Sequence, residues 1–524
     1  MNGAEAVVAT LRACGVQVYF ANPGTSEMHL VAALDKEPTA RAVPCLFEGV
    51  ATGAADGYGR MTGRPAATLL HLGPGLGNGL ANLHNARRAA SPLVNLIGDH
   101  ATHHRALDAP LESDIDAVAG TVSCWVRRCT DPAAASRDAA AAVAAAAHGQ
   151  VATLILPADV SWSPGASPAS PLPSWRPAPV ADDAVSAAAT ALRSGEPAAI
   201  LLGGPATRAP SLRTAARVAA ATGARLLCET FPSRLERGAG LPTVERLGYL
   251  PEGARAQLHG LRHLILVGAR SPVSFFAYPG QPGRLVPQEC HVHVLTEAGG
   301  APEDALAHLA DLLPPAQPAL ASLATPDPPT GELTGETVAA AVGALLPEGA
   351  IVVDEANTSG LWLPAATAGA PLHDWLTLTG GAIGQGLPLA AGAALACPGR
   401  PVVCLEADGS AMYTLQALWT MAREDLDITT VVLANRSYSV LEMEYDRLIP
   451  ASAAAGHGHA RRDLLDLSRP GLDFVGLAQG MGVPASRATS AEDFTTQLTK
   501  ALAEPGPHLV EARVPALFGP ARPT

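Results

Sequence analysis

The sequence predicts a large α/β protein with three domains, each built on a doubly wound parallel sheet. Short apolar runs that suit buried parallel strands, such as residues 402–405 and 428–433, alternate along the chain with segments of helical periodicity. Strands that alternate with helices in this way favour parallel sheets. At 524 residues the chain is longer than one hydrophobic core usually supports, so two or three domains are expected.

Two proline-rich stretches divide the chain. Residues 161–181 and 314–331 are rich in Pro, and they show little of the apolar periodicity of a helix or strand. Such segments are typical of linkers. The predicted domains are therefore residues 1–162, 182–314 and 332–524.

The amino-acid composition argues against some classes of binding partner. The formal net charge is −13 and no basic cluster occurs, which argues against nucleic acid and anionic membranes as partners. Residues 376–399 carry no charge and have the length of a membrane span, but their Gly and Pro content favours a buried loop and a core helix. The eight cysteines are scattered without paired zinc spacing, and the N-terminus lacks a basic and apolar signal segment. A cytoplasmic enzyme that acts on a small molecule is therefore expected.

An acidic residue and an amide each stand at the end of a predicted strand. Asp408 follows the apolar run at 402–405, and Asn435 follows the run at 428–433. Ligands of open α/β sheets bind at the carboxyl ends of the strands. The Asp408 carboxylate, the Asn435 amide oxygen and a carbonyl near Ser437, with diphosphate oxygens and water, would form the all-oxygen shell that Mg²⁺ prefers. No thiolate or imidazole is offered, so zinc is not expected.

The residues after Asp408 suit an anion. Gly409 and Ser410 open a segment that predicts a helix over residues 413–423. The N–H groups at such a helix N-terminus would point at a bound diphosphate.

Residues 406–410 and 433–438 together resemble the cofactor motif of the thiamine-diphosphate enzymes, which begins Gly-Asp-Gly and ends Asn-Asn. Ala407 and Ala434 replace the first Gly and the first Asn of that motif. Both metal-ligating positions are kept. The resemblance therefore implies thiamine diphosphate and Mg²⁺ as cofactors.

Glu48 follows the apolar residues Leu46 and Phe47 at the start of a helix of small residues. An isolated glutamate in this position is more often one favoured by the helix dipole. Residues 45–60, however, resemble the benzoylformate decarboxylase and acetolactate synthase branch of the thiamine-diphosphate family, in which Glu48 matches the glutamate that hydrogen-bonds the aminopyrimidine of the cofactor. A carboxyl shielded by Leu46 and Phe47 could share a proton with that ring and promote its imino form.

His71 ends another predicted strand and precedes a glycine-rich turn at residues 73–79. A lone histidine among leucines is more often a core residue. The resemblance matches His71 to an active-site histidine of the benzoylformate decarboxylase branch, with Thr25 beside it, and implies a role in proton transfer. An alternative interpretation of the glycines at 73–79 is a dinucleotide-binding turn, with Asp99 at the position of a ribose-binding acid. These glycines lack a clean G-x-G-x-x-G spacing, however. A nicotinamide cofactor is therefore disfavoured.

Residues 380–388 provide a further match to the family. A large apolar side chain holds the cofactor bent in these enzymes, and Ile383 falls at that position. The cofactor contacts that the resemblance implies are Asn22, Pro23, Gly24, Asn78, Asn357, Thr358, Gly381, Ile383, Gly409, Ser410 and Tyr438. The implied metal ligands are Asp408, Asn435 and Ser437, and the implied catalytic residues are Glu48, His71 and Thr25.

The resemblance covers essentially the whole chain and implies a pyrimidine-binding, a central and a diphosphate-binding domain in that order. In the family the cofactor lies between the first domain of one subunit and the third domain of its partner, so a homodimer or homotetramer is expected. The implied activity is decarboxylation of a small-molecule 2-oxo acid. Protonation afterwards would release an aldehyde, whereas attack on a second carbonyl would yield an acyloin or acetohydroxy acid.

Two departures from the family leave the substrate open. Benzoylformate decarboxylases use a second histidine from the central domain, and the comparable residues 274–280 contain none. Acetolactate synthases bind FAD and use a tryptophan near the second substrate, and residues 438–445 contain none. The alternatives are a true acetolactate synthase with FAD, a catalytically silent paralogue and a flavin or nicotinamide oxidoreductase. The retained Glu48 and Asp408 favour an active decarboxylase or carboligase.

Overall fold

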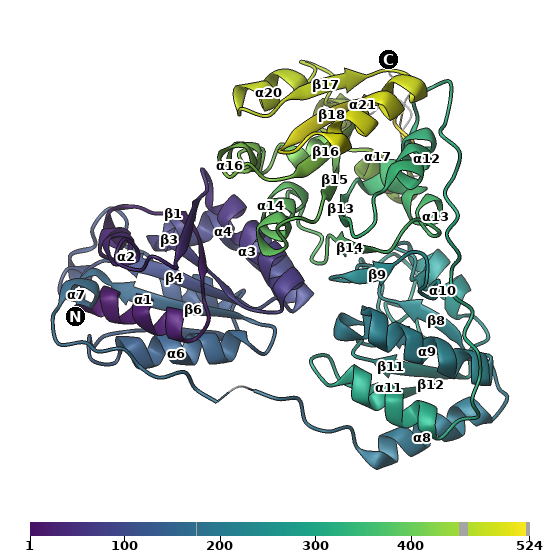
Figure 1. The fold of residues 1–524 in the computed structure, drawn as a ribbon, viewed down its shortest axis with the longest axis horizontal. Helices are drawn as coiled ribbons and strands as arrows, with labels where there is room; N and C mark the ends of the chain where they lie inside the picture. The colour runs from purple at the N-terminus through teal and green to yellow at the C-terminus, as the bar shows by residue number, and fades with distance from the viewer. Residues whose placement is uncertain (174, 450–458, 520–524) are drawn as a thin grey trace. The chain divides into compact units, whose positions relative to one another are not determined.

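The computed structural model describes residues 1–173, 175–449 and 459–519, and it confirms the predicted α/β class with parallel sheets (Figure 1). The chain forms two compact units. The larger unit comprises Met1–Trp175, Thr325–Thr367 and Gly380–Thr524. The smaller unit comprises Arg176–Ala324 and Ala368–Thr379.

The first sheet of the larger unit is six-stranded and parallel, in the order β2-β1-β3-β4-β6-β5. Its strands are β1 (Val18–Asn22), β2 (Arg41–Pro44), β3 (Ala66–His71), β4 (Leu93–Asp99), β5 (Trp125–Arg128) and β6 (Val151–Pro157). β4 and β6 are buried along their whole length, as expected for strands covered on both faces. Buried polar side chains on the central strands satisfy one another, because Thr68 donates to Asn95 and Asn95 donates to Thr153.

Helices cover both faces of this sheet (Figure 1). α1 (Gly3–Ala13) and α6 (Ala135–Ala146) share one apolar core with the strands, while α3 (Glu48–Thr62) and α4 (Leu72–Ala89) pack against β1, β3 and β4. The remaining helical elements are η1 (Thr25–Glu27), α2 (Met28–Leu34), η2 (Arg105–Leu107), α5 (Ile115–Gly120) and α7 (Ala158–Trp162).

The C-terminal part of the larger unit contains a second run of parallel strands, in the order β17-β18-β16-β15-β13. They are β13 (Ile351–Glu355), β15 (Val402–Ala407), β16 (Ile428–Ala434), β17 (Ala485–Ala488) and β18 (His508–Arg513). The helices around them are α12 (Gly335–Leu345), η4 (Asn357–Gly360), α13 (Leu363–Ala366), α14 (Gly386–Ala396), α15 (Asp408–Ala411), α16 (Ala417–Arg423), α17 (Ser439–Leu448), α19 (His459–Leu465), α20 (Phe474–Gly480) and α21 (Ala491–Ala503).

The helix predicted over residues 413–423 is partly wrong. The chain first forms the short α15 and then a turn, and α16 begins only at Ala417. Within that turn the Thr414 hydroxyl donates to the Gly384 carbonyl at 2.9 Å. A side chain anchored outside the helix in this way competes with continuous helical structure.

The smaller unit holds a five-stranded parallel sheet in the order β10-β8-β7-β11-β12. Its strands are β7 (Ala198–Leu202), β8 (Arg225–Cys228), β10 (Glu245–Arg246), β11 (His263–Val267) and β12 (His291–Thr296), with helices α8 (Asp182–Arg193), η3 (Gly204–Thr207), α9 (Ala209–Thr222), α10 (Pro251–Leu258) and α11 (Pro302–Asp311). β9 (Leu235–Arg237) and β14 (His373–Thr377) pair with each other in antiparallel orientation. This pair departs from the all-parallel pattern that the sequence predicts.

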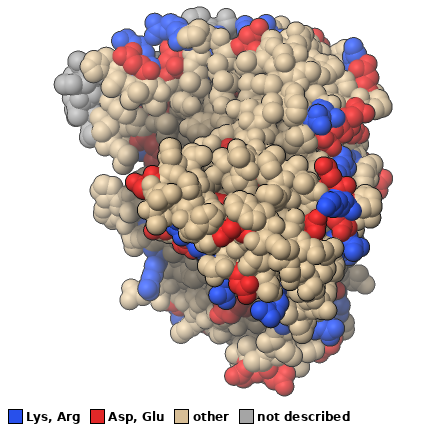
Figure 2. Space-filling view, turned by 90° about the vertical axis from the view of Figure 1, so that its left-hand side faces the viewer, with Lys and Arg blue, Asp and Glu red and all other residues tan. Residues whose placement is uncertain are grey.

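Most of the uncharged stretch at 376–399 lies in a loop and in the core helix α14, as the sequence predicts, while its first two residues end β14 (His373–Thr377). No helix in the described part of the chain is long and apolar enough to cross a bilayer. Charged side chains of both signs are interspersed over the face in Figure 2, which agrees with the lack of a basic cluster in the sequence.

α3 and α14 pack closely within the larger unit, which joins its N-terminal and C-terminal parts. Two glycines permit the approach: a Cβ at Gly57 would overlap the Leu389 carbonyl, and a Cβ at Gly392 would overlap the Ala54 carbonyl. Next to this contact, Gln385 donates to the buried carboxylate of Asp56 at 2.7 Å. The two helix backbones are therefore in direct contact along their small-residue faces.

We expect Gly392→Ala to lower the free energy of unfolding by about 2–3 kcal/mol, because the added methyl group must push α3 and α14 apart. Urea unfolding of wild type and variant measures the change. Gly253→Ala is the matched control, since Gly253 lies in α10 and an added Cβ there meets no atom within 4 Å. The control should be neutral or stabilising by up to about 1 kcal/mol. Equal effects of the two substitutions would contradict the packing argument.

His373 should make the stability depend on pH. Burial lowers the pKa of His373 to about 4, although its Nδ1 lies 2.7 Å from the Pro371 carbonyl. In the unfolded chain His373 binds a proton with a pKa near the ordinary value of 6.5, whereas in the folded chain it binds one only near pH 4. The stability of the fold therefore decreases as the pH drops from 6.5 to 4. We expect a loss of about 1–3 kcal/mol from this group. The wild type and His373→Gln should diverge over that range in urea unfolding, and a constant difference would refute the assignment.

Candidate active site

The carboxyl ends of β15 and β16 bring Asp408 and Asn435 into one region. The two strands are in parallel register, with Ala407 opposite Leu433, so the residues that follow them emerge at the same edge. Asp408 is almost fully buried and accepts the N–H of Gly409 at 2.8 Å and that of Arg436 at 2.5 Å. These bonds hold the carboxylate at the start of α15.

Asn435 is held in the same way by its neighbours. Its amide oxygen accepts the N–H of Ser437 at 2.9 Å, and its amide nitrogen donates to the Ser359 hydroxyl at 3.1 Å. Both Asn435 and Ser437 are buried. The three residues expected to bind a metal therefore meet at this sheet edge.

The donor set at Asp408 suits a hard divalent cation. Burial raises the pKa of Asp408 to about 6, while the N–H groups of Arg436 and Gly409 act in the opposite direction. The Ser437 hydroxyl is buried without a hydrogen-bond partner. Among the described residues no group of three or more His, Cys, Asp or Glu side chains could hold a metal, so a cation here would need further oxygens from outside the protein, such as those of a diphosphate. A cation placed there would stabilise the charged form of Asp408.

Residues from η4 and α15 border the same region. Asn357, which begins η4 in the left-handed conformation at φ 51°, donates to the Ser410 hydroxyl at 3.0 Å. Thr358 is buried beside it. Gly409 lies against the Tyr438 ring, since an added Cβ would stand 2.5 Å from that ring. The residues expected to contact a diphosphate thus surround Asp408.

The loop that carries Gly381 and Ile383 is anchored by buried polar groups. Gly381 and Gly384 both have positive φ, at 75° and 91°, which glycine adopts without strain. Glu355, at the end of β13, accepts the N–H of Gly384 at 2.7 Å and that of Gly386 at 2.5 Å. Glu355 therefore fixes the shape of this loop, and the sequence analysis missed it.

Glu355 is paired with a second buried acid, Glu406 of β15. Burial raises the pKa of Glu355 to about 7, and burial together with the neighbouring Glu355 raises the pKa of Glu406 well above its usual range. Two carboxyls in contact without solvent cannot both ionise cheaply, so the pair holds a proton. Glu406 belongs to the motif quoted for the family resemblance, but its position there suggested no role.

Helix α4 holds the other side of the loop. Asn85 donates to the Ala382 carbonyl at 2.7 Å, and Asn82 donates both to Gly384 at 3.2 Å and to Gly49 at 2.8 Å. Asn82 thus joins the loop of Ile383 to the first turn of α3. Neither asparagine was predicted from the sequence, although two amides three residues apart in a helix share one face and could have indicated a buried role.

Glu48 begins α3 and is 7% exposed. Asn78 donates to its carboxylate at 3.0 Å, so the amide of Asn78, expected to contact the cofactor, orients Glu48. The expected shielding by Leu46 is wrong, because Leu46 is 50% exposed. β2 ends at Pro44, and the irregular residues 45–47 leave the Leu46 side chain turned to the surface, whereas Phe47 packs over Gly49.

The glycine-rich turn expected after His71 is also wrong. α4 begins at Leu72, and residues 73–79 lie inside this helix. The glycines let α4 approach α3: a Cβ at Gly79 would stand 2.8 Å from Thr52, and one at Gly75 would stand 3.2 Å from Glu48. These glycines therefore serve helix packing around Glu48.

His71 ends β3 and is 24% exposed in its side chain. Its Nδ1 lies 2.8 Å from a carboxylate oxygen of Glu27 and 3.1 Å from the Ser26 hydroxyl. Thr25 begins the same 3-10 turn and is exposed, while Gly24 lies against the His71 ring. Asn22 and Pro23 lead from β1 into this turn. The sequence analysis missed Glu27, whose place three residues after Gly24 gave only a helix-start signal.

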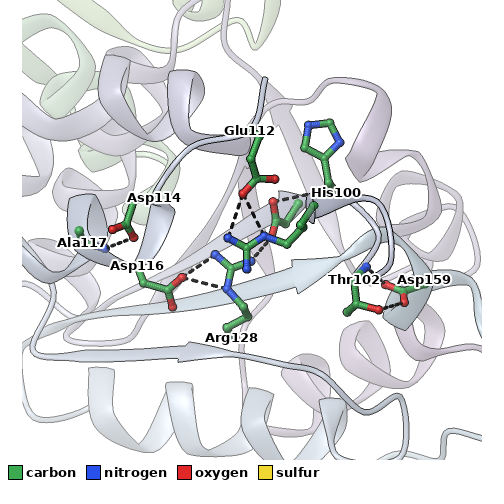
Figure 3. Close-up of polar contacts among 10 residues, drawn as sticks. His100, Thr102, Glu112, Asp114, Asp116, Ala117, Arg128 and Asp159 are labelled. Carbon is green, nitrogen blue, oxygen red and sulfur yellow. Dashed lines mark hydrogen bonds and ion pairs between the residues drawn. The ribbon is translucent and has the colours of Figure 1, made fainter. Parts of the chain in front are cut away.

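Asp99, the acid weighed for a nucleotide ribose, is engaged by arginine. Arg128 pairs with Asp99 and also bonds Asp116, and Arg105 lies 3.6 Å from Asp99 and 2.9 Å from Glu112. Figure 3 shows Arg128 directed at Asp116 and the position of Glu112 in this network. Asp99 is therefore a structural acid at the end of β4, which argues against a nicotinamide site there.

Comparison with known proteins finds relatives along the whole chain. Residues 1–119 match the N-terminal TPP binding domain of thiamine pyrophosphate enzymes, and residues 358–512 match their C-terminal TPP binding domain. A Mycobacterium tuberculosis protein named as a candidate acetolactate synthase large subunit, IlvX, is 62% identical over 521 residues and covers 99% of this chain and 100% of that protein. Benzoylformate decarboxylase of Pseudomonas aeruginosa is 30% identical over 539 residues and covers 96% of each chain.

Solved structures agree with these matches. The thiamine diphosphate-dependent 4-hydroxybenzoylformate decarboxylase of Rhodococcus jostii RHA1 superposes with a TM-score of 0.85 at 26% identity, over 98% of this chain and 99% of that chain. Benzoylformate decarboxylase of Polynucleobacter necessarius shares the fold, with a TM-score of 0.83 at 21% identity over 99% of this chain and 100% of that chain. The chain therefore belongs to the family of thiamine pyrophosphate-dependent enzymes.

Proposed function

We propose that this enzyme uses thiamine diphosphate and Mg²⁺ to decarboxylate a 2-oxo acid, and that it then releases an aldehyde or joins the remaining fragment to a second carbonyl compound. The observation that carries the proposal is the meeting of Asp408 and Asn435 at adjacent strand ends. The names of the relatives, acetolactate synthase and benzoylformate decarboxylase, support the substrate class.

The residues around Asp408 would hold the metal and the diphosphate. Asp408, Asn435 and Ser437 would supply metal oxygens, and the remaining ligands would come from diphosphate and water. Asn357, Thr358, Gly409, Ser410 and Tyr438 would border the diphosphate. When bound, thiamine diphosphate supplies the electron sink that makes loss of carbon dioxide possible.

Glu48 would hold a proton at the pyrimidine ring of the cofactor. Asn78 donates to one carboxylate oxygen at 3.0 Å, which keeps the side chain in one orientation. The low exposure of Glu48 reduces competition from water for that proton. Gly381 and Ile383 lie on the loop that Glu355 and Asn82 anchor, and Ile383 would pack between the rings of the cofactor bound at Asp408.

His71 would transfer a proton to or from bound substrate, with Thr25 and the backbone of Asn22, Pro23 and Gly24 bordering the same space. The retained carboxyls, Glu48 and Asp408, argue against a catalytically silent paralogue. A yellow purified protein with a visible flavin band would instead favour the acetolactate synthase variant that binds FAD.

The first test is carbon dioxide release from a panel of 2-oxo acids that includes pyruvate and benzoylformate, with thiamine diphosphate and Mg²⁺. We expect turnover by the wild type and a fall of at least about 100-fold in kcat/KM for Glu48→Gln, because proton transfer to the cofactor ring is lost. Chelation of the metal should also abolish turnover. The product, aldehyde or acetohydroxy acid, distinguishes the two named activities. No release from any acid would overturn the proposal.

The composition of the site is tested by mixing two inactive variants. We propose a homodimer or a tetramer of dimers in which Glu48 of one chain serves the cofactor bound at Asp408 of its partner. Mixed dimers of Glu48→Gln and Asp408→Ala chains then contain one intact site, and an equimolar mixture should recover roughly a quarter of the wild-type turnover after subunit exchange. Each variant alone is the control. A mixture that stays inactive would place both residues of each site in the same chain.

A further inference from the structure

Glu27 is a fully buried carboxylate that contacts His71. One of its oxygens lies 2.7 Å from the Gly24 N–H and 2.8 Å from His71 Nδ1, and the other accepts the Ser26 hydroxyl at 2.6 Å. Because a backbone N–H and a hydroxyl both donate to it, the Glu27 carboxylate acts as a hydrogen-bond acceptor at this site.

The surrounding backbone leaves room for this pair and for little else. A Cβ at Gly98 of β4 would overlap a carboxylate oxygen of Glu27, and a Cβ at Gly24 would overlap the His71 ring. Both main chains therefore approach the pair as closely as glycine permits. The acid and the imidazole are fixed in position by packing as well as by hydrogen bonds.

The contact determines which ring nitrogen of His71 carries the proton. Because the Glu27 carboxylate accepts, Nδ1 must donate, and Nε2 is the nitrogen left to exchange a proton with a ligand. Ser26 donates to Glu27 at 2.6 Å and so leaves the acceptor role of the carboxylate unchanged.

A second acid, Glu48, lies near His71 but has a different hydrogen-bond partner. Gly75 separates the two groups: its ideal Cβ would stand 3.2 Å from the Glu48 carboxylate and 3.4 Å from the Cβ of His71. Glu48 has its own donor, Asn78, at 3.0 Å. Each carboxylate therefore has a separate partner, and Glu27 is the one in contact with the His71 ring.

We propose that Glu27 is a positioning residue that holds His71 as the Nδ1–H tautomer, with Nε2 ready to accept or donate a proton at the substrate. The catalytic part of this statement rests on the proposed function of His71. The arrangement is that of a carboxylate–histidine pair, in which the acid orients the ring and stabilises the protonated imidazole that forms during transfer.

The substitution Glu27→Gln distinguishes a purely structural role of Glu27 from a role in positioning His71. Glu27 also accepts the N–H of Gly24 at the start of η1, so a loss of that bond would disturb the turn itself. Glu27→Gln keeps an oxygen that can accept this N–H and nearly keeps the side-chain volume. It removes the charge and allows the amide to donate to the imidazole.

The test of the tautomer is solid-state ¹⁵N NMR of histidine-labelled full-length protein without cofactor. Wild type should show His71 protonated at Nδ1, and Glu27→Gln should convert it to a mixture or to the Nε2–H form. The His71→Gln spectrum identifies the signals. Glu196→Gln is the matched control, since Glu196 contacts His263 Nε2 at 3.0 Å in the smaller unit and should leave the His71 signals unchanged. Unaltered His71 signals in Glu27→Gln would overturn the proposal.

Kinetics test the positioning role. With a 2-oxo acid that the wild type decarboxylates, Glu27→Gln should lower kcat at least about 10-fold with little change in KM, and Glu27→Asp, which keeps the charge, should recover part of the loss. Glu196→Gln should keep wild-type kcat. An unchanged kcat in Glu27→Gln would overturn the positioning role. If the wild type decarboxylates nothing, the proposed function fails while the NMR result still decides the tautomer.

Discussion

The close contact between α3 and α14 is the constraint on which the candidate site depends. α3 begins with Glu48, and α14 follows directly after the loop that carries Ile383. The backbones can touch because Gly57 and Gly392 have no side chain to separate them. Asn82 completes the junction by donating to one carbonyl from each part, at 2.8 and 3.2 Å. A shift between the two helices would therefore move the start of α3 relative to the loop that carries Ile383.

Buried carboxyls recur throughout this region, and each has its own means of support. Asp408 is held by backbone N–H groups, Glu27 by Ser26, Gly24 and His71, and Glu355 by the N–H groups of the loop. Burial without solvation favours the protonated form, which explains the raised pKa of Asp408 and of Glu355. Burying several acids close together lowers the stability of the fold. Proteins tolerate such clusters mainly at functional sites, where charges and protons take part in the chemistry.

The comparisons and the geometry answer different questions. Relatives named as acetolactate synthase and benzoylformate decarboxylase match nearly the full length of the chain, so they identify the family. In the smaller unit Phe275 and Phe276 lie in residues 274–280, where no histidine occurs, and they form an aromatic cluster with Phe231 and Tyr249. Under the proposed function, a proton carrier elsewhere in the chain, such as His71, would have to complete turnover.

The sequence by itself determined the α/β class, the strands that end at Asp408 and Asn435, and the helix that begins at Glu48, because hydrophobic periodicity and residues at strand ends are local signals. It misjudged the glycines after His71, since a turn and a closely packed helix both favour glycine. Only the tertiary structure could reveal that Glu27 supports His71, that Glu355 meets Glu406, and that Asn82 reaches Gly384, which lies 302 residues away in the chain. Those contacts join segments distant in sequence, and no local pattern records which buried polar groups will become partners once the helices have packed.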